Sequence, residues 1–304
     1  MLLFLSLSSA DQEVWLCERL APGAVNRTGD VRRCAGGKAV NAARAAAILG
    51  GESLVVGFFG RGQGLVESLA AEGIATDPVY TEGPSRRAAS LIDRERGEVT
   101  ELVEEPHSVS AAEREALEAL FVARARQAAV IGLCGSLPPG LPADFYARLM
   151  AKAGRSRVIV DAQGAALSAA LGAGPFLVKP NRREAGELLG ARAASTAEAA
   201  AQARELCRRG AAHAAVSSGA EGVVLAGEDA LLFRPPPVRA VNTTGCGDAL
   251  AGGIAFGLAA GLSVREAVRL GVACGTASAL DPLPGRFERV QAERIGREIV
   301  VDSL

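Results

Sequence analysis

Short, continuous runs of apolar residues alternate with longer alanine-rich runs along most of the chain. Six runs have the length of buried strands, and they are SLVVGFFG, AAVIGLCG, SRVIVDAQG, PFLVKPN, AAVSSG and GVVLAG. Four runs between them have the length of helices, and they are AVNAARAAAILG, AEREALEALFVARARQ, LPADFYARLMAKAG and TAEAAAQARELCRRG. This alternation predicts an α/β fold in which helices cover both faces of a mostly parallel central sheet.

The first ten residues, MLLFLSLSSA, admit two interpretations. They could be a signal peptide with Ser8 and Ala10 at a small-x-small cleavage site, but no basic residues precede the apolar part, which is short. Their alternation and apolar character also suit a buried first strand, and this is the interpretation we favour. No other segment reaches the ~18 uninterrupted apolar residues of a membrane-spanning helix.

Two stretches, 14–33 and 87–103, interrupt the rhythm because they are more polar and leave no room for a helix. Both have the character of short strands joined by turns. They could pair as a small sheet outside the main one and form a lid, or they could be two unrelated surface hairpins. Farther along, RPPPVRAV has a strand-like character and precedes a glycine-containing loop.

Composition and charge say little about the fold, but they exclude some classes of function. The chain has 304 residues, 49% of them hydrophobic, and a net charge of -1, as expected of a globular protein with a sizeable core. Aromatic residues make up only 4% and no basic run occurs, so neither nucleic acid nor an anionic membrane is an expected partner. Small-molecule chemistry is therefore the expected activity.

The cysteines and histidines indicate neither a disulfide framework nor a metal centre. Six cysteines without a CxxC pair favour reduced thiols and a cytoplasmic location. Neither of the two histidines, His107 and His213, lies beside a second ligand type at metal spacing, so zinc and iron are not expected.

The loop NTTGCGD opens an apolar helix, ALAGGIAFGLAAG. Its small residues let the backbone amides of Gly245, Cys246 and Gly247 converge, and the helix dipole adds about half a positive charge, so a phosphate would fit there. Asp248 follows directly, and its carboxylate could either cap the helix or act as a general base. The glycine loop favours the base, because a carboxylate beside an anion site can take a proton from an attacking hydroxyl.

A second glycine-containing stretch, CAGGKAVNAARAAAILGG, places Lys38 and Asn41 on one face of a helix. An amide on a helix of alanine, valine and isoleucine needs a partner, which could be a ligand or the backbone. The stretch is not a Walker A motif, because Arg32 and Ala39 stand where that motif needs Gly and Ser or Thr. GCGDAL is not a Rossmann fingerprint either, because Leu250 replaces its third glycine.

Lysine is rare in this chain. Only Lys38, Lys152 and Lys179 occur among 33 basic residues, and two of them lie in GGK and VKPN, beside candidate ligand loops. A compact ammonium and a planar guanidinium are not interchangeable, so a site that needs the former would retain lysine against an arginine-rich background. Chance placement is the alternative.

Taken together, the motifs resemble the PfkB (ribokinase-like) carbohydrate kinase family. AGGKAVNAARAAAILGG and NTTGCGDALAGG resemble its two signatures, and GSLPPGLPADFYARL, VDAQGAAL, VKPNRREAGELLG and SSGAEG resemble further family motifs in the right order. The resemblance implies a single domain over 1–304, built as a three-layer α/β/α sandwich with a small β lid from 14–33 and 87–103. The lid is also a candidate surface for a homodimer.

GSLPPG, PGAVNR and KPNRREAGELLG look most like the phosphosugar branch of the family. This implies an ATP- and Mg²⁺-dependent kinase that phosphorylates a hydroxyl of a phosphohexose, with fructose 1-phosphate as the first choice and fructose 1,6-bisphosphate as its product. Tagatose 6-phosphate, fructose 6-phosphate, or an unphosphorylated sugar or nucleoside are alternative acceptors. A nucleotide-binding protein without turnover is the alternative from another class.

The resemblance also assigns roles to residues. Asp248 matches the catalytic base, with Gly245, Cys246 and Gly247 as the anion hole, and Glu184 matches the residue that organises magnesium through water. Substrate-binding positions are Gly37, Lys38, Asn41, Arg27, Arg86, Ser136 and Gln12. Nucleotide-binding positions are Lys179, Asn181, Ser218, Gly219 and Gly222.

Three positions differ from the family pattern, and all lie on the sugar side. Gln12 stands where the branch has a sugar-binding aspartate, and Asp11 precedes it by one residue, so its side chain should lie on the opposite face of the strand. Ala88 replaces an amide, and Ala39 replaces a glycine. The nucleotide side is expected to be intact.

Overall fold

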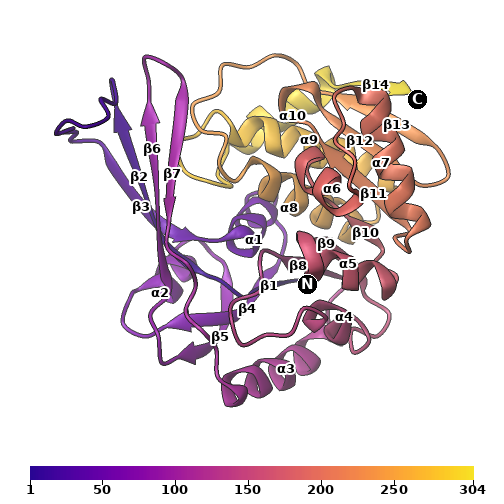
Figure 1. Ribbon diagram of the computed structural model, residues 1–304, viewed down its shortest axis with the longest axis horizontal. Helices are drawn as coiled ribbons and strands as arrows, with labels where there is room; N and C mark the ends of the chain where they lie inside the picture. Colours follow the sequence, from indigo (N-terminus) through magenta and orange to yellow (C-terminus); the bar gives the residue numbers. More distant parts are fainter.

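The computed structural model describes residues 1–304 and contains two separate β-sheets (Figure 1). The larger sheet has ten strands, and seven neighbouring ones, from β5 to β11, run parallel. In spatial order its strands are β14 (Val300–Ser303), β13 (Ala230–Arg234), β12 (Val223–Ala226), β11 (His213–Ser217), β10 (Leu177–Val178), β9 (Arg157–Asp161), β8 (Val130–Cys134), β1 (Leu2–Ser6), β4 (Ser53–Gly60) and β5 (Ala75–Thr81).

The large sheet is buried on both faces, which explains why its strands are continuous apolar runs. Side chains of β1 alternate between two core clusters, with Leu2 and Phe4 in one and Leu3 and Leu5 in the other. MLLFLSLSSA therefore begins with a buried strand, as predicted. The α/β class with a mostly parallel sheet is confirmed.

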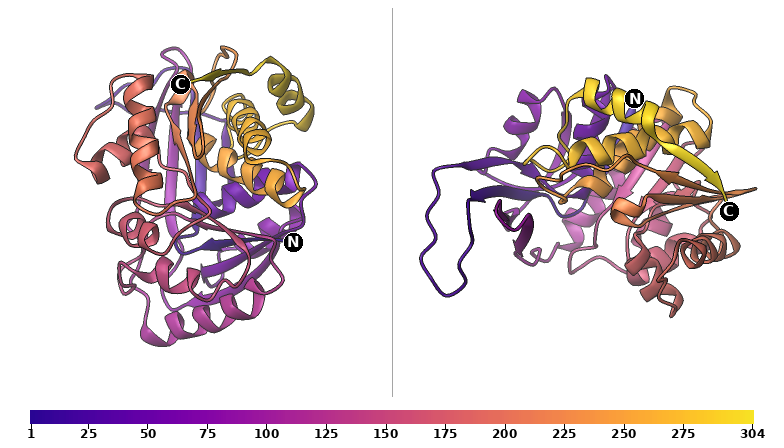
Figure 2. Two further views of the ribbon diagram at one scale, coloured as in Figure 1. Left: turned by 90° about the vertical axis from the view of Figure 1, so that its right-hand side faces the viewer. Right: turned by 90° about the horizontal axis from the view of Figure 1, so that it is seen from above.

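Two layers of helices cover this sheet (Figures 1 and 2). The first layer consists of α1 (Lys38–Ile48), α2 (Leu65–Ala71), α8 (Cys246–Ala259), α9 (Val264–Ser278) and α10 (Arg289–Glu298). The second consists of α3 (Ala111–Ala125), α4 (Phe145–Met150), α5 (Gly164–Gly172), α6 (Arg182–Leu189) and α7 (Thr196–Arg208). A short 3₁₀ turn occupies Gly219–Glu221. None of the helices combines the length and apolar character needed to cross a bilayer.

The two polar stretches pair with each other in the smaller sheet, which we call the lid sheet. It has the order β3 (Val31–Gly36), β2 (Ala10–Cys17), β6 (Arg86–Asp93) and β7 (Glu98–Val103). The strands begin earlier and end later than the 14–33 stretch, because pairing with β6 starts at Ala10 and β3 continues to Gly36. Val14, Leu16 and Ile92 form a small apolar cluster with Leu283 of the main body.

The expectation for RPPPVRAV was wrong. The strand β13 ends at Arg234, the first residue of this stretch, and the rest is irregular up to α8. Consecutive prolines have no N–H to donate to a neighbouring strand, so the β-ladder stops where they begin. After this irregular segment the chain enters the loop before α8, which belongs to the first helix layer.

Helices α1 and α8 approach each other closely at Gly252. A Cβ atom at this position would overlap the carbonyl oxygen of Ala42 and lie 2.9 Å from the Cβ of Ala45. The glycine thus sets the spacing between the helix that carries Asn41 and the helix that carries Asp248.

We predict that Gly252→Ala destabilises the protein by ~1–3 kcal/mol, because an added methyl forces two packed backbones apart. Any activity that depends on the spacing of α1 and α8 should fall with it. Gly172→Ala is the matched control, because Gly172 lies at the end of α5 with no atom within 4 Å of its Cβ position. Urea denaturation of both variants measures the difference, and equal stabilities would contradict the role given to Gly252.

Candidate active site

The carboxyl ends of the parallel strands and the N-termini of α1 and α8 meet at one edge of the large sheet. Ser6 ends β1, Cys134 ends β8, Asp161 ends β9 and Lys179 directly follows β10. Ligands of open parallel sheets bind at this edge. The two glycine-containing loops recognised in the sequence open onto it.

The N-terminus of α8 provides backbone donors. Gly245 is the N-cap residue, with φ of 79°, and a Cβ there would lie 2.7 Å from the Cβ of Pro284, so the loop needs glycine. The amide of Cys246 donates to the carbonyl of Thr243 at 3.4 Å, whereas those of Gly247 and Asp248 have no acceptor in the chain. The amide of Gly245 has no acceptor either, so the free donors include Gly245 and Gly247 of the predicted set together with Asp248.

Asp248 lies in the first turn of α8 and is buried, with 8% exposure. Its Oδ2 accepts a hydrogen bond of 2.8 Å from Nδ2 of Asn41 on α1. Burial, and next the negative charge of Asp161, raise the pKa of Asp248 to about 6. A carboxylate with such a pKa is ionised at neutral pH but is a stronger base than an exposed aspartate.

Asp161 joins two of the three lysines. Its Oδ1 lies 3.1 Å from Nζ of Lys38, and its Oδ2 lies 3.1 Å from Nζ of Lys179. Burial opposes ionisation of Asp161, but the two ammonium groups outweigh it and lower its pKa. The Coulombic attraction of Asp161 in turn raises the pKa of Lys38, which stays charged.

Lys179 lies beside the free amides of α8. A Cβ at Gly247 would lie 3.4 Å from its Nζ, in van der Waals contact, so the ammonium lies directly next to the helix N-terminus. The third lysine, Lys152, pairs with Glu118 on the surface, 2.6 Å away. The two lysines singled out by their position in the sequence thus converge, and the remaining one does not.

The predicted nucleotide residues lie in adjoining loops. Asn181 caps α6 and forms a capping box with Glu184, whose Oε1 also lies 3.5 Å from Nζ of Lys38. Asn181 pairs with Ser217 in an isolated bridge, which places it next to the turn that contains Ser218, Gly219 and Gly222. These residues form one continuous rim.

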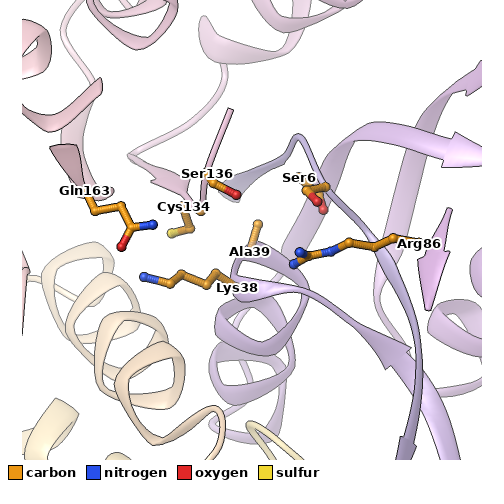
Figure 3. A pocket seen from close by; sticks show the side chains of 9 residues that line it. Ser6, Lys38, Ala39, Arg86, Cys134, Ser136 and Gln163 are labelled. Atoms are coloured by element: carbon orange, nitrogen blue, oxygen red, sulfur yellow. The ribbon is translucent and has the colours of Figure 1, made fainter. Parts of the chain in front are cut away.

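A polar cavity lies between Lys38 and Arg86 of the lid sheet. Figure 3 shows the side chains of Lys38, Arg86, Ser136 and Gln163 around it. Nε of Arg86 is buried without a hydrogen-bond partner, as is Oγ of Ser8. Unpaired buried donors are costly, so they indicate a place for an anionic or hydroxyl-rich ligand. The cavity is lined by Ser6, Ser8, Lys38, Ala39, Arg86, Cys134, Gly135, Ser136 and Gln163.

Gly37 adjoins this cavity, whereas three of the predicted substrate residues, Gln12, Arg27 and Asn41, do not line it. Gly37 is the N-cap residue of α1, with φ of 110°, and a Cβ there would lie 3.0 Å from the carbonyl oxygen of Ser8. Gln12 is buried in the lid sheet and donates from Nε2 to Oγ of Ser90. Arg27 is exposed in the long loop between β2 and β3, which extends away from the body of the molecule (Figure 2). Within one chain, therefore, Arg27 does not belong to the cavity.

Sequence reasoning missed Asp161, the carboxylate to which both lysines bind, and the cavity residues Ser6, Ser8, Cys134 and Gln163. Asp161 did carry a signal, because it is an aspartate at the carboxyl end of a buried apolar strand within VDAQGAAL. The serines carried none, because serine is common at strand ends.

The fold and the site define an α/β phosphotransferase. The sequence model of the pfkB family carbohydrate kinases matches residues 5–286, and the chain belongs to this family. It is 36% identical to the 1-phosphofructokinase of Xanthomonas campestris pv. campestris, over 81% of this chain and 80% of that protein. It is 34% identical to the 1-phosphofructokinase of Rhodobacter capsulatus, over 82% and 81%.

Solved structures agree. Phosphofructokinase-2 from Escherichia coli in complex with fructose-6-phosphate is 29% identical, covers 98% of both chains and superposes with a TM-score of 0.88. A Thermotoga maritima protein described as a possible 1-phosphofructokinase gives a TM-score of 0.91 over 100% and 99% of the two chains. At 21% identity it supports the fold alone. The ribokinase-like fold, the use of ATP and transfer to an alcohol group follow from the family.

We predict that Asp248→Asn stabilises the folded protein at neutral pH. The pKa of Asp248 is about 6 in the folded protein and 3.8 for a free aspartate, so its ionisation costs up to about 3 kcal/mol of folding free energy at ~1.36 kcal/mol per pKa unit. This cost is absent below about pH 3.8 and complete above about pH 6.

The neutral amide avoids the cost at every pH and still accepts the bond from Asn41. Denaturation of both proteins between pH 4 and 8 should show a stability difference that opens as the pH rises. A constant difference would contradict the raised pKa.

Proposed function

We propose that this protein is an ATP-dependent 1-phosphofructokinase that transfers the γ-phosphoryl group of ATP to a hydroxyl of fructose 1-phosphate and forms fructose 1,6-bisphosphate. The named relatives favour this acceptor. The observation that carries the chemistry is the buried Asp248, which lies beside free amides and two ammonium groups at the edge of the sheet.

In the proposed mechanism Asp248 accepts the proton of the acceptor hydroxyl. The hydroxyl oxygen then bonds to the γ-phosphorus while the bond from that phosphorus to the bridging oxygen breaks, and ADP leaves with the electron pair. The amides of Gly247 and Asp248, together with Lys179, would stabilise the charge on the transferred group. Asn41 would keep Asp248 directed toward the acceptor.

We propose that the rim formed by Lys179, Asn181, Ser218, Gly219 and Gly222 binds the nucleotide. Lys179 supports this role best, because its buried ammonium lies beside the free amides of α8 and can neutralise phosphate charge. Ser218 and Gly222 hold a tight turn through a 2.8 Å backbone bond, which fits a loop that packs against a flat or anionic ligand.

Magnesium is the cation expected with the nucleotide. No three His, Cys, Asp or Glu side chains of the chain are grouped to hold a metal ion by themselves. Asp161 and Glu184 are buried carboxylates that open toward Lys38, and this donor set fits an ion held mainly by phosphates and water. We propose that Glu184 contacts such water molecules; the bound ion would neutralise phosphate charge.

Asp248→Asn should lower kcat by ~10² to 10⁴, because it removes the general base, while the Kd for ATP changes little. The assay couples ADP formation to NADH oxidation and is run with fructose 1-phosphate, fructose 6-phosphate, tagatose 6-phosphate and free sugars. The wild type should have its highest kcat/KM for fructose 1-phosphate. Near-native turnover of the variant would refute the assignment of Asp248, and no turnover with any acceptor would refute the kinase.

Arg86→Ala should raise the KM for fructose 1-phosphate by about 10- to 100-fold. The substrate's own phosphate would lose charge-assisted hydrogen bonds worth roughly 1.5–3 kcal/mol each, and the unpaired Nε of Arg86 is available to make one. The KM for ATP should stay within about twofold. An unchanged KM for the sugar would favour an unphosphorylated acceptor.

Arg27→Ala is the comparison variant. Because Arg27 is exposed and distant from the cavity lining, it can reach a sugar phosphate only from a second copy of the chain, and we propose a homodimer formed through the lid sheet. The exposed Leu102 and Val103 on β7 support such a surface, and phosphofructokinase-2 from E. coli is known in a tetrameric form. Light scattering should give the mass of two chains, and Arg27→Ala should raise the KM for fructose 1-phosphate. The mass of a single chain would overturn the proposed dimer.

A further inference from the structure

Helix α1 carries a buried arginine, Arg44, that no ligand site described above uses. Only 3% of it is exposed. Its five N–H groups donate to five acceptors, so the guanidinium is fully satisfied by the chain itself. The acceptors are both carboxylate oxygens of Glu72, Oδ1 of Asn41 and the carbonyl oxygens of Ala35 and Pro284.

Arg44 determines which way the amide of Asn41 points. An arginine only donates hydrogen bonds, so the amide atom that faces it, 3.0 Å from Nη1, must be the oxygen Oδ1. The NH₂ group of Asn41 is then directed at Oδ2 of Asp248, 2.8 Å away. Without Arg44 the amide could turn over and place its oxygen against the carboxylate, where the two would repel each other.

The other bonds of Arg44 fix the surroundings of the same site. Its bond to the carbonyl of Pro284, 3.1 Å long, holds the residue that packs against the N-cap glycine Gly245. Its bond to Ala35, 2.7 Å long, holds the end of lid strand β3. Glu72, at the C-terminal end of α2, supplies the counter-ion and is 30% exposed at its side chain.

We propose that Arg44 is a positioning residue for the kinase reaction, which acts by holding the amide of Asn41 in the one orientation that donates a hydrogen bond to Asp248. This inference rests on the proposed role of Asp248 as the base. It assigns to Arg44 an effect on proton transfer, although Arg44 itself touches neither Asp248 nor the cavity.

The charges that face Asp248 make this hydrogen bond important. From the elements around it these are Lys38 on α1, Cys134 on β8, Asp161 on β9, Lys179 after β10 and Cys246 on α8. Burial raises the pKa of the Cys246 thiol to about 12, and burial also raises that of Cys134, so neither cysteine carries charge at neutral pH. Asp161 raises the pKa of Asp248, whereas Lys38, Asn41 and Lys179 lower it. Arg44 therefore acts on Asp248 through the orientation of Asn41.

The test is the pH profile of kcat/KM for fructose 1-phosphate in Arg44→Met. The acid limb, which reports the base in the free enzyme, should move up by about one to two pH units, because Asp248 loses its donor. Activity should therefore fall at least about fivefold more at pH 6 than at pH 8.5, while the KM for ATP stays within about twofold. A purely structural role would lower activity equally at all pH values, and that result overturns the proposal.

A double-mutant cycle with Asn41→Leu separates orientation from other effects. Asn41→Leu should shift the acid limb by itself, and adding Arg44→Met should shift it no further. Additive shifts overturn the proposal. Arg269→Met is the matched control, because Arg269 is half-buried and donates to the carbonyls of Gly296 and Ile299, so it should cost stability without moving the limb.

If Arg44→Met does not fold, Glu72→Ala takes its place in the cycle, because the exposed end of the pair tolerates truncation better. A smaller shift in the same direction is expected, and an unmoved acid limb overturns the proposal. Asp248→Asn distinguishes the two levels of the argument: if it keeps near-native turnover the base is wrong, and if it is inactive while the limb of Arg44→Met is unmoved, only the role of Arg44 fails.

Discussion

The hydrogen bond from Asn41 to Asp248 joins α1 to α8 at the edge of the sheet where the cavity opens. A buried carboxylate must retain a donor and a nearby cation, or it takes up a proton. The close approach of the two helices at Gly252 brings the donor within reach. The N-cap glycine Gly245 and the loop at Pro284 then fix where α8 begins.

Burial together with the charges at this edge raises the pKa of Asp248, whereas the charges lower the pKa of Asp161. Asp161 binds two ammonium groups and stays ionised, and its negative charge helps to raise the pKa of Asp248. The same aspartate thus holds the lysines in place and makes its neighbour more basic. Lysine suits this arrangement better than arginine, because a compact ammonium can approach both a carboxylate and the glycine amides of α8.

The sequence predicted well those elements whose evidence is local. SLVVGFFG coincides with β4, and the other apolar runs overlap β8 to β12, because a strand buried on both faces must be apolar throughout. The sequence predicted poorly those strands that form only because they pair with a neighbouring strand. The edge strands β5 and β14 have no long apolar run, and RPPPVRAV is irregular after Arg234 because its prolines cannot donate to a neighbouring strand.

Arg44 shows why part of the site escaped prediction. Arg44 is one of many arginines in the chain and lies on an alanine-rich helix, and no neighbouring residue in the sequence distinguishes it from a solvent-exposed arginine. Its partners lie at sequence separations of 3, 9, 28 and 240 residues, so its burial becomes visible only when the chain has folded.

Gln12 is a second residue whose role could not be predicted from the sequence alone. Its departure from the family pattern is plain in the sequence, but its consequence depends on β6, where Ser90 accepts a hydrogen bond from its amide. Asp11, one residue earlier, is less buried than Gln12 and lies on the other face of β2, so it does not replace a sugar-binding aspartate on the inner face. Gln12 is engaged inside the lid sheet, and the polar groups that line the cavity where the lid meets the main sheet include Arg86, Ser136 and the unpaired hydroxyl of Ser8.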